Sequence, residues 1–215
     1  MPPLACITCG PAFEPLDGVR RITNFSTGEI GSVLAEAFLK SGFDVVCFRG
    51  EAASFPAPAG AIMRVFTTNG SLAEGLRSLG RAPDVILHAA ALCDFVLESI
   101  DGSDGLSKLS SRSGSIRLTL KPAKKVLSEM RGWFPEARII GWKYELDGSR
   151  EQAVSRGAAQ IQETRTDGCV INGSAYGEGF GLLLPDGSLP HFPDKATLAS
   201  HLAGLPARQP KRPVM

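Results

Sequence analysis

The sequence predicts an α/β fold built on a doubly wound, mostly parallel sheet, with helices on both faces and a small C-terminal hairpin. Short apolar runs bounded by turn residues alternate along the chain with segments whose apolar residues recur every three or four positions. In addition, the run at 84–91 is almost continuously apolar, which is typical of a strand buried on both faces of a parallel sheet. Strands and helices that alternate in this way form Rossmann-like folds.

The first half of the chain predicts strands and helices in alternation, apart from one pair of consecutive strands. The most regular helix has Ile30, Leu34 and Phe38 on one face, and Gly42 ends it. The expected elements are strand 4–9, helix 28–41, strands 43–48 and 62–66, a helix capped by Ser71, and strand 84–91.

The second half opens with a polar segment at 98–114, rich in Gly and Ser, which predicts a mobile loop. Asp194 is expected to cap the last helix, and Pro185-Asp186-Gly187 to join the strands of the hairpin. The expected elements are strand 115–120, helix 124–133, strand 137–142, helix 149–164, strand 168–172, a hairpin of 182–184 with 189–192, and a short final helix. We expect residues 1–205 to form one domain and the basic tail 206–215 to be flexible.

Composition and charge exclude several classes of protein. The net charge is +1 and the charges are spread along the chain, so we expect no nucleic-acid surface. No apolar run approaches the roughly 18 residues that cross a bilayer, and residues 1–10 lack the charged start of a signal peptide. We therefore expect a cytoplasmic protein that does not bind membranes. Its five cysteines should be free, and Cys6 and Cys9, although spaced C-x-x-C, should lie on opposite faces of one strand.

The connection between the first strand and the first helix is the first candidate for chemistry. Small residues at its two ends, Gly10 and Ser26-Thr27-Gly28, let backbone N–H groups approach an anion near the start of a helix. Ser26 and Glu29 also have the spacing of a capping box. Because the G-x-G-x-x-G motif is missing, spacing alone leaves two interpretations: a phosphate-binding loop, or a capped helix after a long loop.

Other polar residues lie beyond the ends of predicted strands, where ligands bind in open α/β sheets. Asp94 could hold a hydroxyl group or a magnesium-bound water, and a turn or cap residue is the equal alternative. His88, inside a strand, predicts a core histidine with a hydrogen-bond partner. Four cations could neutralise phosphate, although each taken alone is typical of a solvated surface: Lys108, Lys124, Lys143 and Arg156.

Residues 7–28 read I-T-C-G-P-A-F-E-P-L-D-G-V-R-R-I-T-N-F-S-T-G, which resembles the opening of the phosphopantothenoylcysteine synthetases, or phosphopantothenate–cysteine ligases. Further stretches resemble this family along nearly the whole chain: A-A-A-L-C-D-F at 89–95, K-L-S-S at 108–111, G-W-K at 141–143, D-G-C-V-I-N at 167–172, Gly179-Phe180 and Lys195. The K-L-S-S stretch is similar to the branch that stands alone, without a flavin-dependent decarboxylase domain. The resemblance implies a homodimeric ligase that joins 4′-phosphopantothenate and cysteine through an acyl-nucleotide, using CTP or ATP and Mg²⁺.

The resemblance also implies roles for the residues that match the family's motifs. Asn24 would hold the acyl intermediate for attack, and Lys108 would reach the nucleotide from its loop. Asp94 would border the nucleotide and hold magnesium. The rest of the implied nucleotide site consists of Gly10, Pro11, Ser26, Thr27, Gly28, Ala89, Ala90, Lys124, Trp142, Lys143 and Phe180.

Departures from the family pattern keep other interpretations open. Ala12 stands where the family has Thr, Pro122-Ala123 replaces a Thr/Asn-Pro pair, and residues 160–164 lack expected basic residues. Ala12 and the missing basic residues favour a non-catalytic, nucleotide-sensing paralogue. A nicotinamide-dependent oxidoreductase is a third interpretation, which the missing glycine motif and the ambiguous Arg49-Gly50-Glu51 disfavour.

Overall fold

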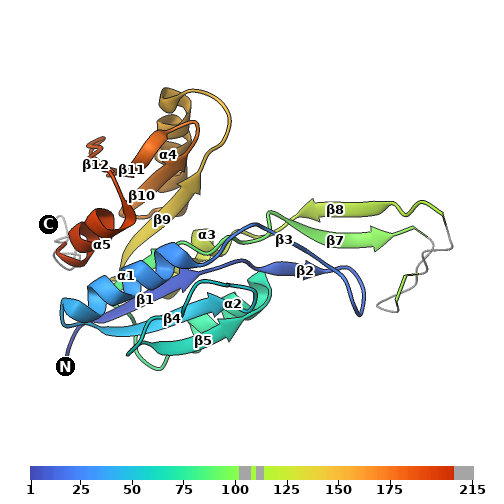
Figure 1. Ribbon diagram of the computed structural model, residues 1–215, viewed down its shortest axis with the longest axis horizontal. Helices are drawn as coiled ribbons and strands as arrows, with labels where there is room; N and C mark the ends of the chain where they lie inside the picture. Colours follow the sequence, from blue (N-terminus) through green and yellow to red (C-terminus); the bar gives the residue numbers. More distant parts are fainter. Residues whose placement is uncertain (102–107, 110–113, 206–215) are drawn as a thin grey trace, which may run out of the picture.

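An eight-stranded sheet forms the centre of the computed structural model, which describes residues 1–101, 108–109 and 114–205. Its strands are β1 (Leu4–Cys9), β4 (Asp44–Gly50), β5 (Ile62–Phe66), β6 (Val85–His88), β9 (Arg138–Tyr144), β10 (Gly168–Gly173), β11 (Gly177–Leu183) and β12 (His191–Phe192). They lie in the order β12-β11-β10-β9-β6-β1-β4-β5 (Figure 1). Neighbours from β10 to β5 are parallel, whereas β11 is antiparallel to β10 and β12. The predicted fold class and C-terminal hairpin are confirmed.

Helices cover both faces of this sheet. They are α1 (Glu29–Lys40), α2 (Asn69–Arg77), α3 (Val126–Trp133), α4 (Arg150–Thr164) and α5 (Lys195–Ala203). Leu34 and Phe38 of α1 pack with Leu198 of α5 against one face. On the other face, Leu72 of α2 and Met130 of α3 share a second apolar cluster, and α4 covers β10. Helices α1 and α5 therefore lie on the same face of the sheet.

Strand β1 is buried along its whole length and sets how closely α1 approaches the sheet. Cys6 belongs to the cluster under α2 and α3, whereas Cys9 faces Gly31 of α1. A Cβ atom at Gly31 would lie only 2.1 Å from the Cβ of Cys9. The predicted separation of Cys6 and Cys9 is confirmed, and a glycine is required where α1 crosses β1.

Two hairpins extend from the body side by side, and we call them the arms (Figure 1). The first arm pairs β2 (Phe13–Pro15) with β3 (Arg21–Thr23), and the second pairs β7 (Phe95–Ile100) with β8 (Leu118–Pro122). The Leu97 amide donates to the Glu14 carboxylate at 3.0 Å and links the arms.

The arms correct two sequence predictions. The segment expected to be a loop from 98 onward begins with the end of β7, which runs to Ile100, and its residues 102–107 and 110–113 lie outside the described residues. The strand expected at 115–120 lies at 118–122. Glu98 and Ser99 are consecutive exposed polar residues, so β7 lacks the apolar alternation that predicts a strand. Likewise, the long connection after Gly10 contains the whole first arm.

The helix ends contain two further corrections. Thr68, not Ser71, is the N-cap of α2, and Ser71 completes the capping box three residues later. The capping box expected from Ser26 and Glu29 is wrong, because Gly28 is the N-cap of α1 and no side chain caps that helix. The Asp194 cap of α5 is confirmed: its carboxylate accepts the Thr197 amide at 2.7 Å.

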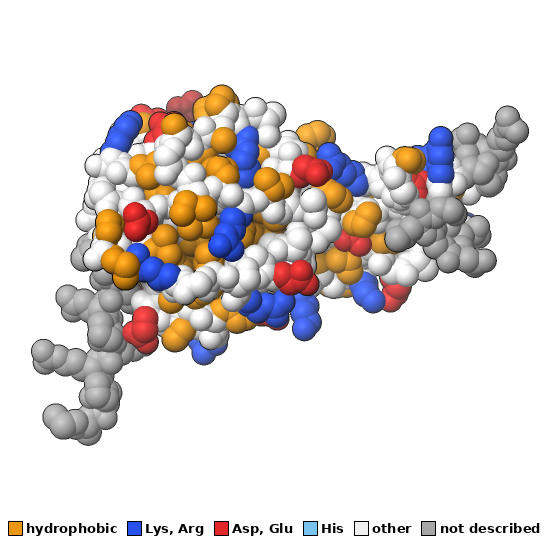
Figure 2. Space-filling view, turned by 90° about the horizontal axis from the view of Figure 1, so that it is seen from below, with side chains coloured by type: hydrophobic (Ala, Val, Ile, Leu, Met, Phe, Trp, Pro, Cys, Tyr) orange, Lys and Arg blue, Asp and Glu red, His pale blue; other side chains and the backbone are white. Residues whose placement is uncertain are grey.

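No helix within the described ranges combines the length and apolar character needed to cross a membrane. On the face shown in Figure 2, Lys and Arg side chains are scattered among acidic ones. The tail predicted to be flexible, 206–215, lies outside the described residues.

Candidate nucleotide site

Two glycines lie side by side where phosphate binding is predicted: Gly10 at the carboxyl end of β1 and Gly28 at the start of α1. Gly10 and Gly28 both have φ near +78°, a left-handed conformation that favours glycine. A Cβ atom at Gly10 would lie 2.7 Å from the Ala53 Cβ, and one at Gly28 would lie 3.0 Å from the same atom. The Phe55 amide donates to the Thr27 carbonyl at 3.0 Å, so the segment after β4 packs against the residues that precede α1. We call Gly10, Pro11 and Ser26–Gly28 the phosphate loop.

The segment after β6 runs alongside the phosphate loop. The Ala91 amide donates to the Gly10 carbonyl at 3.0 Å, and the Ala12 amide donates to the Ala91 carbonyl at 3.0 Å. The Ala90 amide lies 3.4 Å from the Thr8 hydroxyl oxygen. The structure therefore brings Ala89 and Ala90 next to Gly10 and Pro11, at the strand ends where open α/β sheets bind ligands.

A buried histidine supports this segment. His88 is 7% exposed, and its Nδ1 lies 2.7 Å from the Thr8 hydroxyl, which confirms the predicted partnered core histidine. Because the Thr8 oxygen accepts from the Ala90 amide, its own proton can be donated to Nδ1 of a neutral imidazole. Burial lowers the pKa of His88 to about 4.

We expect His88 to make the fold sensitive to acid. His88 takes up a proton near pH 6.5 in the unfolded chain but only near pH 4 in the folded chain. The contribution of neutral His88 to the free energy of unfolding therefore falls as the pH drops from 6.5 to 4. The loss should approach about 3 kcal/mol below pH 4. Denaturant titrations of His88→Asn from pH 7 to 4 should show a shallower decline than wild type. Exposed His201, changed to Asn, is the matched control, and equal declines in all three proteins would contradict the prediction.

Asn24 lies between the first arm and the phosphate loop. It is exposed, and its Nδ2 donates to the Leu92 carbonyl at 2.7 Å, which bridges the connections that follow β3 and β6. One amide N–H is thus used to orient the side chain, while an exposed amide retains another N–H and its oxygen for a ligand. The arrangement suits both the predicted role and a bracing role.

Arg49 is a residue that sequence reasoning left without a role. It follows Phe48 at the carboxyl end of β4, and its Nη2 donates to the carbonyls of Ala53, at 2.9 Å, and Phe55. Its Nη1 is buried without a hydrogen-bond partner, 3.4 Å from the position of a Cβ on Gly28. The sequence did offer a signal for Arg49, because it is a cation at the carboxyl end of a buried apolar strand. Ligands of open α/β sheets bind at that end of the strands.

The thiols below the phosphate loop form a close pair. The sulfurs of Cys9 and Cys47 lie 3.7 Å apart, on neighbouring strands. The hydrogen bond from Cys47 lowers the pKa of Cys9 and, against the opposing effect of burial, the positive charge of Arg49 lowers it further. All five cysteines are free and buried.

The predicted residues of β9 and β11 divide between the two faces of the sheet. Trp142 and Phe180 pack with the cluster of α1 and α5, on the phosphate-loop side. Lys143 points to the face of α4, where its Nζ lies 3.5 Å from the Glu145 carboxylate. Arg156 pairs with the same carboxylate. The structure thus groups Trp142 and Phe180 with α1 but directs Lys143 to an ion pair elsewhere.

The remaining predicted residues lie along the second arm. Asp94 is exposed at its base, where the Ala123 amide donates to the Asp94 carbonyl at 2.8 Å, and Lys124 follows, also exposed. Lys108 is exposed and precedes Leu109, whose amide donates to Asp17 at 3.1 Å. The structure therefore ties Lys108 to the first arm.

Asp17 is the anchor for this segment. Burial opposes ionisation of its carboxyl group, but hydrogen bonds from backbone amides, including that of Leu109, and the charge of Arg20 lower its pKa overall. The Arg20 guanidinium also donates to the Leu109 carbonyl at 3.2 Å. The turn of the first arm thus holds the chain beside Lys108 by both its amide and its carbonyl.

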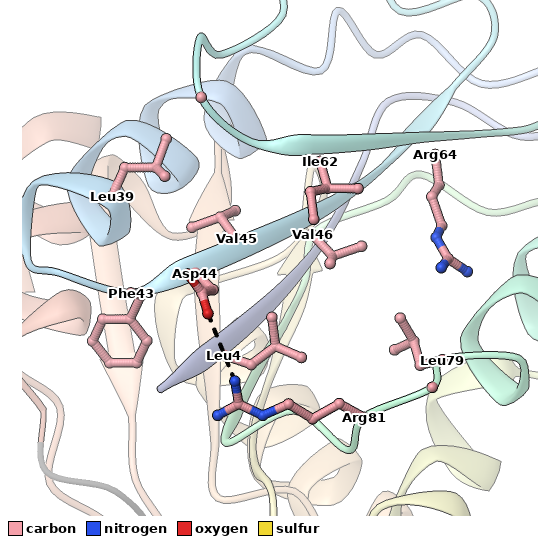
Figure 3. Close-up of a pocket in the computed structure, with 12 residues that line it drawn as sticks. Leu4, Leu39, Phe43, Asp44, Val45, Val46, Ile62, Arg64, Leu79 and Arg81 are labelled. Atoms are coloured by element: carbon pink, nitrogen blue, oxygen red, sulfur yellow. Dashed lines mark ion pairs between the residues drawn. The ribbon is translucent and has the colours of Figure 1, made fainter. Parts of the chain in front are cut away.

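A pocket of about 430 Å³ lies at the opposite end of the sheet (Figure 3). Leu4, Val46 and Ile62 from the starts of their strands line it, together with Asp44. Its Arg81 is already engaged, at 3.7 Å from the Asp44 carboxylate. Ligands of parallel sheets bind at the carboxyl ends of strands, so we do not assign the nucleotide to this pocket.

Comparisons with known proteins show the family of this chain. Residues 4–184 match the family described as the DNA/pantothenate metabolism flavoprotein C-terminal domain. The coenzyme A biosynthesis bifunctional protein CoaBC of Methanocaldococcus jannaschii is 32% identical over 163 residues, which cover 76% of this chain and 38% of that protein. The chain thus spans less than half the length of this curated relative.

Solved structures show the same fold. The DNA/pantothenate metabolism flavoprotein from Streptococcus pneumoniae superposes with a TM-score of 0.81 at 22% identity, covering 92% of this chain and 95% of that one. A Cab2 mutant in complex with phosphopantothenate-cysteine superposes with a TM-score of 0.72 at 18% identity, covering 93% and 83%.

Proposed function

Because the chain belongs to the family of the DNA/pantothenate metabolism flavoprotein C-terminal domain, we propose that it is a phosphopantothenate–cysteine ligase of coenzyme A biosynthesis. The observation that carries the proposal is the glycine turn of the phosphate loop beside Ala89 and Ala90, within a chain that matches this family. The relatives' role in coenzyme A biosynthesis, and the phosphopantothenate-cysteine held by a protein of the same fold, support the choice of substrates.

The reaction needs an activated carboxylate, because oxide is a poor leaving group. The carboxylate of 4′-phosphopantothenate attacks the α-phosphorus of CTP or ATP, which forms an acyl-nucleotide and releases pyrophosphate. The amine of cysteine then attacks the acyl carbon, forms the amide, and displaces the mononucleotide with loss of the amine proton. Positioning and stabilisation of the developing negative charge supply the rate enhancement.

Residues of this chain suit each requirement. Backbone N–H groups of the phosphate loop, at the positive end of α1, would bind the triphosphate. Ala89 and Ala90 would border the nucleotide, and Trp142 and Phe180, on the same face as α1, would pack near its base. Asn24 would orient the acyl carbonyl.

Magnesium would enter with the nucleotide. No group of three potential ligand side chains lies together in the described part of the chain, so a resident metal cage does not fit. Exposed Asp94 does fit a nucleotide-borne Mg²⁺, which keeps several waters and usually takes one or two protein carboxylates beside the phosphates. Bound there, the ion would neutralise phosphate charge. Lys108 and Lys124 would add cations from the second arm, whereas Lys143 would first have to leave Glu145.

The arms also support a homodimer. They expose the large apolar side chains of Val19, Phe95, Leu118 and Leu120, and exposed Phe25 follows the first arm directly. Phe25 is fully exposed, and large apolar side chains exposed together mark protein interaction sites when they form a patch. We propose that two copies pair through their arms, in the cytoplasm, where thiols such as the five free cysteines stay reduced.

A nucleotide-sensing paralogue is the second candidate. Ala12 is fully buried beside the phosphate loop and lacks the hydroxyl that the ligases place there. Gln160, at a position where basic residues are expected, lies 3.3 Å from the Cys169 sulfur, within the fold. A sensor would bind nucleotide without releasing pyrophosphate.

The deciding experiment measures pyrophosphate release. We expect release with 4′-phosphopantothenate, MgCTP or MgATP, and faster turnover when cysteine is added. Either nucleotide at millimolar concentration should also raise the thermal midpoint, because a ligand that binds only the folded state stabilises it. A thermal shift without pyrophosphate release would favour the sensor. The absence of both the thermal shift and pyrophosphate release would contradict both candidates.

A further inference from the structure

Arg49 carries a positive charge directly behind the phosphate loop. Its Nη2 holds two carbonyls of the segment that follows β4, those of Ala53 and Phe55. Ala53 in turn contacts the loop, because its Cβ leaves no room for side chains on Gly10 or Gly28. One guanidinium therefore supports the surface on which both glycines rest.

The second half of this guanidinium makes no hydrogen bond to an oxygen atom, although the Arg49 side chain also interacts with the Cys9 thiol. Nη1 is buried and donates no hydrogen bond, and it lies 3.4 Å from the Cβ position of Gly28. The nearby carboxylate of Glu51 pairs with Arg21 at 3.0 Å instead. Arg49 is half-buried, and a partly desolvated cation next to the positive end of α1 is unfavourable unless an anion lies close by.

An anion on the phosphate loop would complete this arrangement. It would face the start of α1 and the charge of Arg49 across the Gly28 turn, where burial weakens screening by solvent. The Cys9 thiol is a second group that senses this charge. Its sulfur is already hydrogen-bonded to Cys47 on the neighbouring strand.

We propose that Arg49 is a positioning residue for the triphosphate, which shapes the phosphate loop through the Ala53–Phe55 segment and supplies positive charge from beneath it. This inference rests on the proposed function, because it assigns Arg49 to the same site. It concerns the binding of polyphosphate and leaves binding of the phosphopantothenate carboxylate and of cysteine unaffected.

Two substitutions separate charge from shape. Arg49→Gln keeps an N–H donor for the Ala53 carbonyl but removes the charge, whereas Arg49→Lys keeps the charge but loses the fork. We expect Arg49→Gln to weaken binding of inorganic tripolyphosphate, followed by calorimetry, by at least about tenfold, and Arg49→Lys to retain more affinity. In the full reaction, the KM for CTP or ATP should rise more in Arg49→Gln than in Arg49→Lys. The KM for phosphopantothenate should stay within about twofold of wild type in both variants.

Arg64→Gln is the matched control, since Arg64 is a half-buried arginine on β5 that lines the pocket at the other end of the sheet. It should bind tripolyphosphate like wild type. Folded Arg49→Gln that binds tripolyphosphate with wild-type affinity would overturn the proposal. Should that variant not fold, Arg49→Lys with a higher KM for phosphopantothenate but not for nucleotide would also overturn it. Because tripolyphosphate binding requires no turnover, this test stands apart from failure of the ligase reaction itself.

Discussion

Asn24→Asp is expected to stop transfer of the acyl group to cysteine while pyrophosphate release continues. The wild-type amide can donate to the oxyanion that develops when the amine attacks, whereas a carboxylate cannot donate and adds negative charge. Loss of one such donor typically costs about 10²–10³ in rate, so coupling should slow by at least that order. Mass spectrometry of a quenched single turnover should detect acyl-nucleotide accumulated on the enzyme.

The structure also offers a bracing role that this experiment must separate. Asn24 holds the Leu92 carbonyl at 2.7 Å, and the aspartate variant loses that donor. If Asn24 only braces the two connections, stability and both half-reactions should fall together. Thr23→Val is the matched control, because Thr23 is the neighbouring residue at the end of β3 and its hydroxyl donates to the Ala12 carbonyl at 2.7 Å. A folded Asn24→Asp enzyme that couples cysteine at the wild-type rate would remove Asn24 from the mechanism.

Gly28→Ala is expected to remove most nucleotide binding. The new methyl group would lie 3.0 Å from the Ala53 Cβ and 3.4 Å from Arg49 Nη1, so the phosphate loop must shift. Backbone N–H groups that move by even 1 Å no longer converge on a phosphate, and the KM for CTP or ATP should rise at least about tenfold. Steady-state kinetics with varied nucleotide would measure the change.

Gly42→Ala controls for the cost of a left-handed residue. Gly42 has φ of +83°, and a Cβ there meets nothing within 4 Å. Both variants should lose about 1–2 kcal/mol of stability through the backbone alone. Only Gly28→Ala should lose nucleotide affinity. An unchanged KM for nucleotide in folded Gly28→Ala would exclude the phosphate loop from the binding site.

The sequence by itself determined the α/β class, the positions along the chain of the strands that form the central sheet, and the C-terminal hairpin. Each depends on local patterns: β1 is apolar apart from Thr8, and α1 repeats its apolar positions at helical spacing. The buried, partnered state of His88 followed from its place in an apolar run. The family followed from the long stretch at 7–28, within the residues that match it.

Only the tertiary structure decided the arms and the details of the site. Strand β7 has no apolar periodicity, and it is held by β8 and by Glu14, 83 residues away in sequence. Asn24 meets Leu92 across 68 residues, and the Gly28 cap and the Arg49 support depend on Ala53, which no local pattern links to them. Burial periodicity is encoded locally because each element must bury one face. Hydrogen bonds and close approaches between connections depend instead on which strand ends the sheet topology brings together.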